Sequence, residues 1–447
     1  MSPSAKYLPW ERPPVPGPPK HGRTALLSSI ALTVALAVAG IATLARCGGS
    51  EVAAPVPVEL RDCRPKVDSP GKLPFVAKVD PRFQAFARDL LRRHPTELTI
   101  VVGLDLRTAR PLFIASRRSE DPVGSDLMLA TSPKYPMASL AKILTSAAAL
   151  ESGIPPEHEL VFRGKPHTLY KSQVRAPANG TEVTLAKAFA FSINPIFGQL
   201  GASKLGEGTI LRWADSLGFN RSQGLGNGVP AGVMAKPSDT FNLAELSSGF
   251  IRTTFISPVH AAMIVRKFGH DGILRPPAWD APRIDSTCEA TVFPESPLYT
   301  GLSSLFSLTV DSGTARGGFS KAWPLESREG FEIGGKTGSL DGTDPEGHYE
   351  WFAGYARMEG EPDSGIAIAV MTVNAGKHVL NASWTAATLL HYWSRHADEF
   401  ARPPVPATAV SDSDMTAFTE ADQDALADRP WHRPWKKKKR SGHRKRH

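Results

Sequence analysis

The segment with the clearest chemical potential is PMASLAKILTSAAALESGI, residues 136–154, where a serine and a lysine stand three positions apart. Residues three apart share a helix face, so Ser139 and Lys142 would be neighbours on a helix that starts at the serine. Apolar surroundings and the positive end of a helix dipole favour the neutral amine. Such an amine can accept a hydroxyl proton, which would make Ser139 an activated nucleophile and Lys142 its base. On its own the pattern is short, and a serine cap beside a surface lysine is the more common arrangement.

A second segment, AFSINPIFGQLG at residues 190–201, carries two polar groups that suit the same reaction. Ser192 and Asn194 stand two positions apart just before a proline, so a loop there could direct both side chains into one cleft. The hydroxyl could relay a proton, and the amide could hold a substrate carbonyl. The alternative is ordinary turn chemistry, because Ser-x-Asn-Pro is a good turn sequence.

A third segment, GGKTGSL at residues 334–340, places glycines inside a strand pattern. Such glycines mark the close approach of another backbone or of a ligand. Lys336 and Thr337 would offer a cation and a hydroxyl to a carboxylate. The edge of the strand would offer backbone N–H groups to an oxyanion. The alternative is a glycine-rich hairpin, which does not require the lysine.

The elements that must position these residues follow from hydrophobic periodicity and turn signals. We expect a helix at 80–94 capped by Asp80, then a hairpin, helices and loops through 139–290, a second strand pair, a third strand and a closing helix. A hairpin at one end, helices between, and strands returning near the end indicate one sheet with helical layers. The expected hairpin strands are 97–106 and 111–116, the later strands are 331–340, 350–358 and 365–375, and the closing helix is 381–396.

Residues 24–45 carry no charge over 22 positions. A helix of that length would measure about 33 Å, enough to cross a bilayer core of about 30 Å. Basic residues dominate the segment before it, which predicts a disordered cytoplasmic segment at 1–23 and a chain that continues outside the cytoplasm, on the periplasmic side. We therefore expect a single-pass anchor in the cytoplasmic membrane. A cleaved signal peptide is the alternative.

Beyond the anchor, residues 46–76 form a Pro-rich linker, 77–401 the main domain, and 402–447 a tail that we expect to be disordered. The tail ends in KKKKRSGHRKRH, which holds eight of the 52 basic residues, so the remaining 44 balance the 44 acidic ones. A neutral body excludes a nucleic-acid groove in the main domain. The basic end would suit an anionic membrane surface or wall polymer, and a solvated charge run is the alternative.

The chain has only three cysteines, Cys47, Cys63 and Cys288. In an oxidising compartment Cys63 and Cys288 could pair, and two free thiols are the alternative. No CxxC pair and no histidine cluster with ligand spacing occurs, so we expect neither a metal site nor another cofactor.

Together the three segments resemble the penicillin-binding transpeptidases, a serine acyltransferase family marked by SxxK, SxN and KTG motifs in this chain order. Ser192 stands 53 positions after Ser139, and Lys336 stands 144 positions after Ser192. Three motifs in this order are far more specific than one. The segments DSGTARGG and WFAGYA extend the resemblance, which covers about residues 77–401. It implies an α/β (α+β) fold, a three-layer sandwich with a mainly antiparallel central sheet flanked by helices.

The resemblance also implies a role for each motif residue. Ser139 would be acylated, with Lys142 as its base, and Ser192 would pass the proton to the leaving group with help from Lys336. Asn194 would hold the substrate amide. The substrate-binding strand would contribute Thr337, Gly338 and Ser339, and the N–H groups of Ser139 and Ser339 would form the oxyanion hole.

The activity that the resemblance implies is a D,D-transpeptidase that cross-links peptidoglycan stem peptides and is acylated by β-lactams, with cell-wall synthesis proteins as further partners. A D,D-carboxypeptidase, in which water attacks the acyl-enzyme, is the nearest alternative. A β-lactamase and a β-lactam sensor are weaker alternatives. The first would need a Glu-x-x-x-Asn loop that residues 195–235 lack, and the second a signalling domain that residues 1–23 are too short to form.

Overall fold

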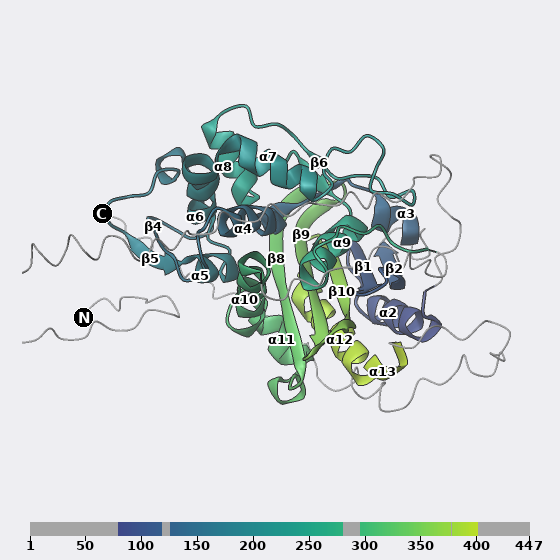
Figure 1. Cartoon of the computed structure of the whole chain (residues 1–447). Helices are drawn as coiled ribbons and strands as arrows, with labels where there is room; N and C mark the ends of the chain where they lie inside the picture. The colour runs from purple at the N-terminus through teal and green to yellow at the C-terminus, as the bar shows by residue number, and fades with distance from the viewer. Residues whose placement is uncertain (1–78, 119–125, 280–295, 377, 401–447) are drawn as a thin grey trace, which may run out of the picture. The chain divides into compact units, whose positions relative to one another are not determined.

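A five-stranded antiparallel sheet is the centre of the computed structural model, which describes residues 79–118, 126–279, 296–376 and 378–400 (Figure 1). The strand order is β2-β1-β10-β9-β8, so the first hairpin pairs with the last strand, and β8 is an edge strand. The strands are β1 (Leu98–Asp105), β2 (Pro111–Arg118), β8 (Phe331–Thr343), β9 (Glu346–Met358) and β10 (Glu361–Asn374).

Both faces of this sheet are covered by helices, which makes three layers. Side chains alternate between faces along a strand, and in β10 Ala367 and Ala369 belong to one core while Ile368 and Val370 belong to the other. The first core includes α4 (Ala141–Glu151), α9 (Pro258–Gly269) and most of α10 (Pro297–Asp311). The second includes α2 (Pro81–Arg93), α11 (Arg316–Ala322), α12 (Ala382–Arg395) and α13 (Ala397–Phe400).

The region between the two halves of the sheet is mainly helical, but it also contains two small sheets that the sequence did not predict. Their strands have two to four residues, too few for a recognisable alternation. They are β3 (Tyr135–Pro136), β7 (Thr254–Ile256) and β6 (Val233–Met234) in one sheet, and β4 (Glu159–Phe162) with β5 (Thr181–Thr184) in the other. The remaining helices are α3 (Asp126–Thr131), α5 (Leu185–Ala190), α6 (Asn194–Gln199), α7 (Gly206–Ser216) and α8 (Thr240–Ser248), with η1 (Ala138–Leu140), η2 (Lys171–Gln173), η3 (Leu200–Leu205) and η4 (Leu325–Ser327).

The expected antiparallel sheet with helical layers is confirmed, and so are the elements at its ends. Asp80 caps α2 by accepting hydrogen bonds from the N–H groups of Arg82 and Phe83, each at 3.0 Å. Asn381 caps the closing helix through the N–H of Trp384 at 3.0 Å. Both caps stand where the sequence places a short polar residue before an apolar helix face.

Several expectations fall outside the described residues. They concern the segment 1–23, the anchor at 24–45, the linker at 46–76, the tail at 402–447, and the pairing of the cysteines, and all of them stay predictions, as do the domain boundaries. Among the helices that the structure describes, every one is too short or too polar to cross a membrane.

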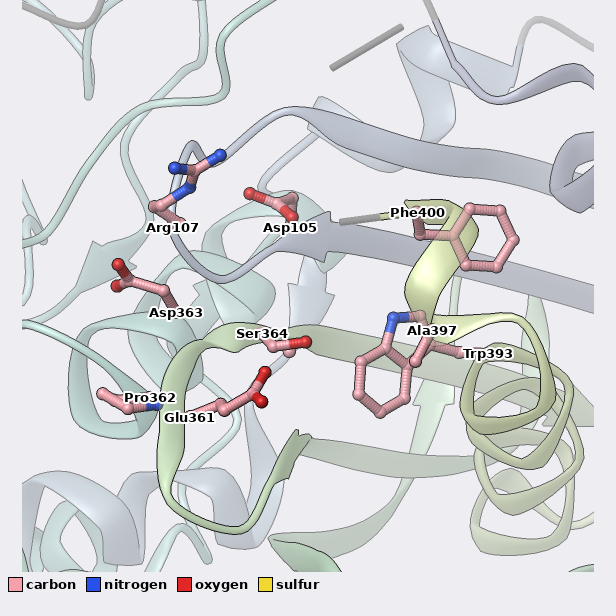
Figure 2. A pocket seen from close by; sticks show the side chains of 10 residues that line it. Asp105, Arg107, Glu361, Pro362, Asp363, Ser364, Trp393, Ala397 and Phe400 are labelled. Carbon is pink, nitrogen blue, oxygen red and sulfur yellow. The ribbon is translucent and has the colours of Figure 1, made fainter. Parts of the chain in front are cut away.

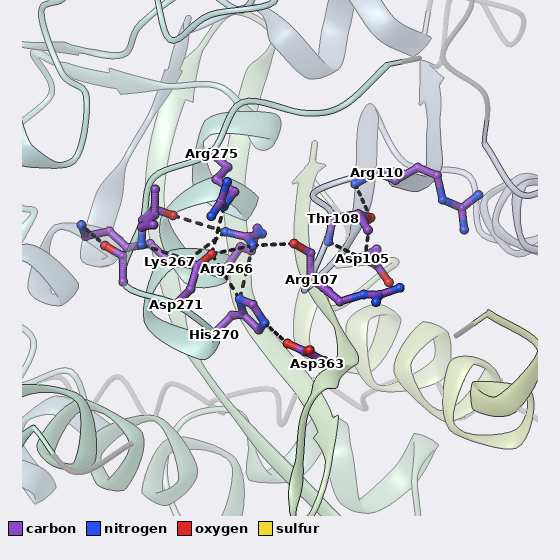
Figure 3. Close-up of polar contacts among 12 residues, drawn as sticks. Asp105, Arg107, Thr108, Arg110, Arg266, Lys267, His270, Asp271, Arg275 and Asp363 are labelled. Atoms are coloured by element: carbon purple, nitrogen blue, oxygen red, sulfur yellow. Dashed lines mark hydrogen bonds and ion pairs between the residues drawn. The ribbon is translucent and has the colours of Figure 1, made fainter. Parts of the chain in front are cut away.

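At one end of the sheet, the β1–β2 turn and the β9–β10 hairpin border a cavity against α12 and α13 (Figure 2). A buried ion network holds this end together (Figure 3). The side chains of Arg266 and Asp271 are fully buried and joined by two hydrogen bonds of 3.1 Å each. Arg266 also donates to the Arg107 carbonyl at 3.0 Å, and His270 Nε2 lies 2.6 Å from Asp363 Oδ1. The network therefore links the end of α9 to both turns of the sheet.

We expect Asp271→Asn to destabilise the fold, because it leaves the Arg266 guanidinium buried without its counter-charge. Removal of one partner from a buried ion pair costs about 3 kcal/mol or more. Urea unfolding at neutral pH would measure the loss. Asp215→Asn, at an exposed position of α7, is the matched control and should change the free energy of unfolding by no more than about 0.5 kcal/mol. A loss below about 1 kcal/mol in Asp271→Asn would contradict the assignment.

Candidate active site

Ser139 lies in a strained turn between β3 and α4. Ala138 has φ +50, in the left-handed region that a non-glycine residue avoids at a cost of about 1–2 kcal/mol. The turn is held from the sheet by Trp351, whose indole N–H donates to the Pro136 carbonyl at 3.0 Å. Ser139 itself is half-buried in the short helix η1 and α4 begins two residues later. Strain of this kind beside a partly exposed hydroxyl is typical of a functional site.

Lys142 is the centre of the site. Its side chain is fully buried, and Nζ lies 2.8 Å from Ser139 Oγ and 2.8 Å from Asn194 Oδ1. Nζ also donates to the Ser248 carbonyl and lies 5.5 Å from the centre of the Phe197 ring. One amine thus joins the first two motifs and the end of α8.

Burial lowers the pKa of Lys142 well below its usual value, and the positive charge of Lys336 lowers it further. Both causes favour the neutral amine. The distance of 2.8 Å to Ser139 Oγ lies within the range for proton transfer to a general base. The expectation of a desolvated lysine beside the serine agrees with this geometry.

Ser192 and Asn194 lie in the turn between α5 and α6. Ser192 is the second strained non-glycine residue of the site, with φ +56, and it is nearly buried. The Asn194 N–H donates to the Pro166 carbonyl at 2.7 Å, which fixes the start of α6 against the loop before η2. The structure thus brings Asn194 directly onto Lys142, with Ser192 two residues away on the same turn.

The KTG segment lies on β8, and it passes along the turn between β3 and α4 that holds Ser139. A Cβ at Gly338 would stand 3.2 Å from the Ser139 nitrogen, so the strand backbone runs beside that N–H. Ser339 is exposed. Thr337 Oγ1 lies 2.5 Å from Thr314 Oγ1, and Thr314 donates to the Ala190 carbonyl at 3.0 Å through its N–H. The outer strand β8 therefore passes beside the turn that holds Ser139. The substrate-binding roles expected of its residues stay predictions.

Lys336 is fully buried, and desolvation lowers its pKa to about 7. Its Nζ donates to the Thr337 carbonyl at 2.7 Å and lies 5.5 Å from the centre of the Phe189 ring. Within the described residues the structure records no hydrogen bond between Lys336 and Ser192. The expected assistance of Ser192 by Lys336 therefore has no direct contact to support it here.

The sequence did not reveal several residues that shape the site. Gly249 ends α8 in a left-handed conformation, φ +72, directly after the carbonyl that Lys142 contacts. Phe250 follows and is 40% exposed. His167, on the loop that holds Asn194, has a pKa below its usual value because of desolvation and the charges of Lys142 and Lys336, opposed by a hydrogen bond to the Ser192 backbone. A helix-stop signal marks Gly249, but nothing in its local sequence places it beside Ser139.

The arrangement can activate a hydroxyl and stabilise an oxyanion. A buried amine contacts the hydroxyl and an amide oxygen, and the backbone of β8 runs beside the Ser139 N–H. In the part of the chain that the structure describes, no group of three His, Cys, Asp or Glu side chains is arranged to hold a metal ion. The geometry suits acyl transfer through a serine ester.

A family model for the penicillin-binding protein transpeptidase domain matches residues 99–389. The peptidoglycan D,D-transpeptidase PbpA of Mycolicibacterium smegmatis is 26% identical over 279 residues, which are 58% of this chain and 53% of that protein. This chain therefore spans about half the length of that curated relative.

Solved structures share the fold at low sequence identity. PBPA from Mycobacterium tuberculosis matches with a TM-score of 0.53 at 22% identity, covering 71% of this chain and 79% of that one. The same protein as a ceftriaxone acyl-enzyme complex matches with a TM-score of 0.53 at 22% identity, over 72% and 78%. A peptidoglycan glycosyltransferase from Burkholderia ambifaria matches with a TM-score of 0.55 at 17% identity, over 74% of this chain and all of that one.

We expect Gly249→Ala to slow acylation of Ser139 by a penicillin. A Cβ there would lie 2.0 Å from the Ala138 carbonyl oxygen and 2.9 Å from the Ser139 nitrogen, so the nucleophile turn must move. A displacement of about 1 Å can cost about a hundredfold in rate, and we expect a loss of at least about tenfold. Gly206→Ala is the control, because Gly206 also has a positive φ, +77, but nothing within 4 Å of a Cβ. Equal rates for both variants, measured with a fluorescent penicillin, would show that the clash is absorbed elsewhere.

We expect Lys336→Gln to move the acid limb of the acylation pH profile to higher pH. The charge on Lys336 lowers the pKa of Lys142, so its removal raises that pKa and the neutral base appears only at higher pH. The shift should be largest below about pH 7, where Lys336 is protonated in the wild-type protein. Lys204→Gln, at an exposed position, should leave the profile in place. An acid limb that stays in place or moves to lower pH in Lys336→Gln would rule out the electrostatic coupling between the two lysines.

Proposed function

The chain belongs to the penicillin-binding protein transpeptidase domain family, and from this premise we propose that it is a serine D,D-transpeptidase of peptidoglycan. One observation carries the proposal. The fully buried Lys142 Nζ stands 2.8 Å from both the Ser139 hydroxyl and the Asn194 amide oxygen, beside the edge of β8. A membrane anchor or a scaffold would not need a desolvated amine between these groups.

In the first half-reaction, neutral Lys142 takes the Ser139 proton while Oγ attacks the carbonyl between the last two D-alanines of a stem peptide. The oxyanion accepts hydrogen bonds from the Ser139 and Ser339 N–H groups, which are preorganised in η1 and β8. Thr337, Gly338 and Ser339 bind the terminal carboxylate along the strand edge. Ser192 passes the proton to the departing amine, and D-alanine leaves an ester on Ser139.

In the second half-reaction, the amine of another stem peptide attacks that ester. The ester carbon–oxygen bond breaks, an amide forms, and the amine proton returns through Lys142 and Ser139. The charge of Lys336 adds to the burial that lowers the pKa of Lys142, and Asn194 holds the peptide amide. Water in place of the amine would give the carboxypeptidase outcome.

β-Lactams should acylate the same serine. The ceftriaxone acyl-enzyme of the Mycobacterium tuberculosis protein, which shares this fold, supports that part of the proposal. The apolar segment 24–45 supports a single-pass anchor in the cytoplasmic membrane, with the catalytic domain on the outer, periplasmic side. Peptidoglycan lies on that side, and cell-wall synthesis proteins would be the partners there.

We expect purified protein to take up fluorescent penicillin covalently, and Ser139→Ala to take up none while keeping the wild-type unfolding midpoint. Full labelling of Ser139→Ala would assign the nucleophile elsewhere. The same preparation, incubated with a stem-peptide donor and an amine acceptor, should form the cross-linked amide. Hydrolysis alone, with acceptor present in excess, would make the protein a carboxypeptidase and refute the transpeptidase proposal.

A further inference from the structure

A cavity of about 370 Å³ lies at one end of the sheet, between the β1–β2 turn and the β9–β10 hairpin (Figure 2). It is separate from the Ser139 site. Across the sheet Lys336 aligns with Ala353, Ala369 and Val102, whereas the cavity wall begins at Asp105. Three strands and three residues correspond to a separation of about 17 Å.

Charged side chains of both signs line the cavity, and the wall that carries Arg107 also carries the Asp105 carboxylate, whose Oδ1 accepts hydrogen bonds from within the β1–β2 turn. Arg107 extends from the β1–β2 turn, and Glu361 and Asp363 lie on the β9–β10 hairpin (Figure 2). In the described residues the guanidinium of Arg107 and the carboxylate of Glu361 have no ion-pair or hydrogen-bond partner, and both residues are exposed. Asp363 is held in place by His270, at 2.6 Å, as the last member of the buried network (Figure 3). The Arg107 guanidinium and the Glu361 carboxylate are therefore groups of opposite charge, on opposite walls, that a ligand can pair with.

A buried donor also faces this space. Trp393 is only 2% exposed, and its indole nitrogen is directed into the cavity (Figure 2). No described residue accepts a hydrogen bond from it. A buried indole N–H usually has an acceptor, because an unpaired one loses its hydration without compensation. The Trp393 N–H is therefore a donor at the cavity from which a ligand oxygen can accept a hydrogen bond.

We propose that this cavity, which we name the Arg107 pocket, binds a short peptide with free ends. The ligand carboxylate pairs with Arg107, and its ammonium group pairs with Glu361. A peptide carbonyl accepts the Trp393 N–H, and small apolar side chains contact the rings of Trp393 and Phe400. Arginine suits a carboxylate because its donors form a planar fork. The pocket volume falls in the range of small-molecule sites, about 300–1,000 Å³.

This pocket goes beyond the transpeptidase proposal, because it is a second peptide site away from the nucleophile. The dipeptide D-alanyl-D-alanine and the free amino acid D-alanine are two sources of the same zwitterionic chemistry. Only the dipeptide brings the additional carbonyl for Trp393. We therefore expect the pocket to prefer the dipeptide.

The test is equilibrium dialysis of radiolabelled D-alanyl-D-alanine against the full chain in detergent, after treatment with excess penicillin to occupy the Ser139 site. We expect saturable binding of one dipeptide per chain. Arg107→Gln and Glu361→Gln should each weaken binding at least tenfold, and Trp393→Phe should weaken it severalfold. N-acetylation or C-amidation of the dipeptide should cost at least tenfold, and free D-alanine should bind more weakly than the dipeptide.

Glu182→Gln, at an exposed position of β5 outside the pocket, is the matched control and should bind as the wild type. Lack of saturable binding to the penicillin-treated wild type would overturn the proposal, and so would wild-type affinity in Arg107→Gln and Glu361→Gln. Arg107 and Glu361 are exposed, so their variants test the proposal even where Trp393→Phe fails to fold. Penicillin labelling of every variant is scored in parallel. A wild-type protein that takes up penicillin normally but does not bind the dipeptide refutes the pocket alone, and absent labelling in the wild type refutes the transpeptidase proposal alone.

Discussion

The burial of one amine is the constraint on which the rest of the site depends. Lys142 has no access to water, so every proton position and lone pair around Nζ must be met by the protein. Ser139, Asn194 and the Ser248 carbonyl meet them, and these groups come from three segments far apart in the sequence. Each acceptor fixes one segment, so the contacts that make the amine a base also assemble the cleft.

The two turns that bring Ser139 and Asn194 to Lys142 both contain strained backbone. Ala138 and Ser192 both adopt positive φ, and each costs free energy that the surrounding packing must offset. The Trp351 hydrogen bond to Pro136 holds one turn, and the Pro166 carbonyl holds the other through Asn194. The long strands β8 and β9 supply the rigid frame behind both. A reactive serine on a flexible loop would lose this orientation.

The sequence predicted the elements whose signals are local, and it missed those set by tertiary contact. The cap at Asp80, the hairpin and the long strands follow from periodicity and were confirmed, whereas two-residue strands such as β3 leave no pattern. The three motifs were found because their side chains carry the chemistry. The Ser248 carbonyl is a backbone acceptor and has no sequence signature, and Gly249 reads only as a helix end. The sequence predicted a cation at Lys336, and the complete burial that lowers its pKa to about 7 has no signature in the motif.

The two buried lysines explain how one site can hold both a base and a cation. Two ammonium groups in a desolvated cleft repel each other, so protonation of one disfavours protonation of the other. Complete burial and the charge of Lys336 both lower the pKa of Lys142, well below its usual value. Lys336, lowered to about 7, remains partly protonated at neutral pH. Environments that separate the pKa values of neighbouring groups assign their roles. The state with neutral Lys142 beside Ser139 and charged Lys336 beneath the strand edge is therefore the one in which the hydroxyl can be activated while an anionic substrate end is attracted.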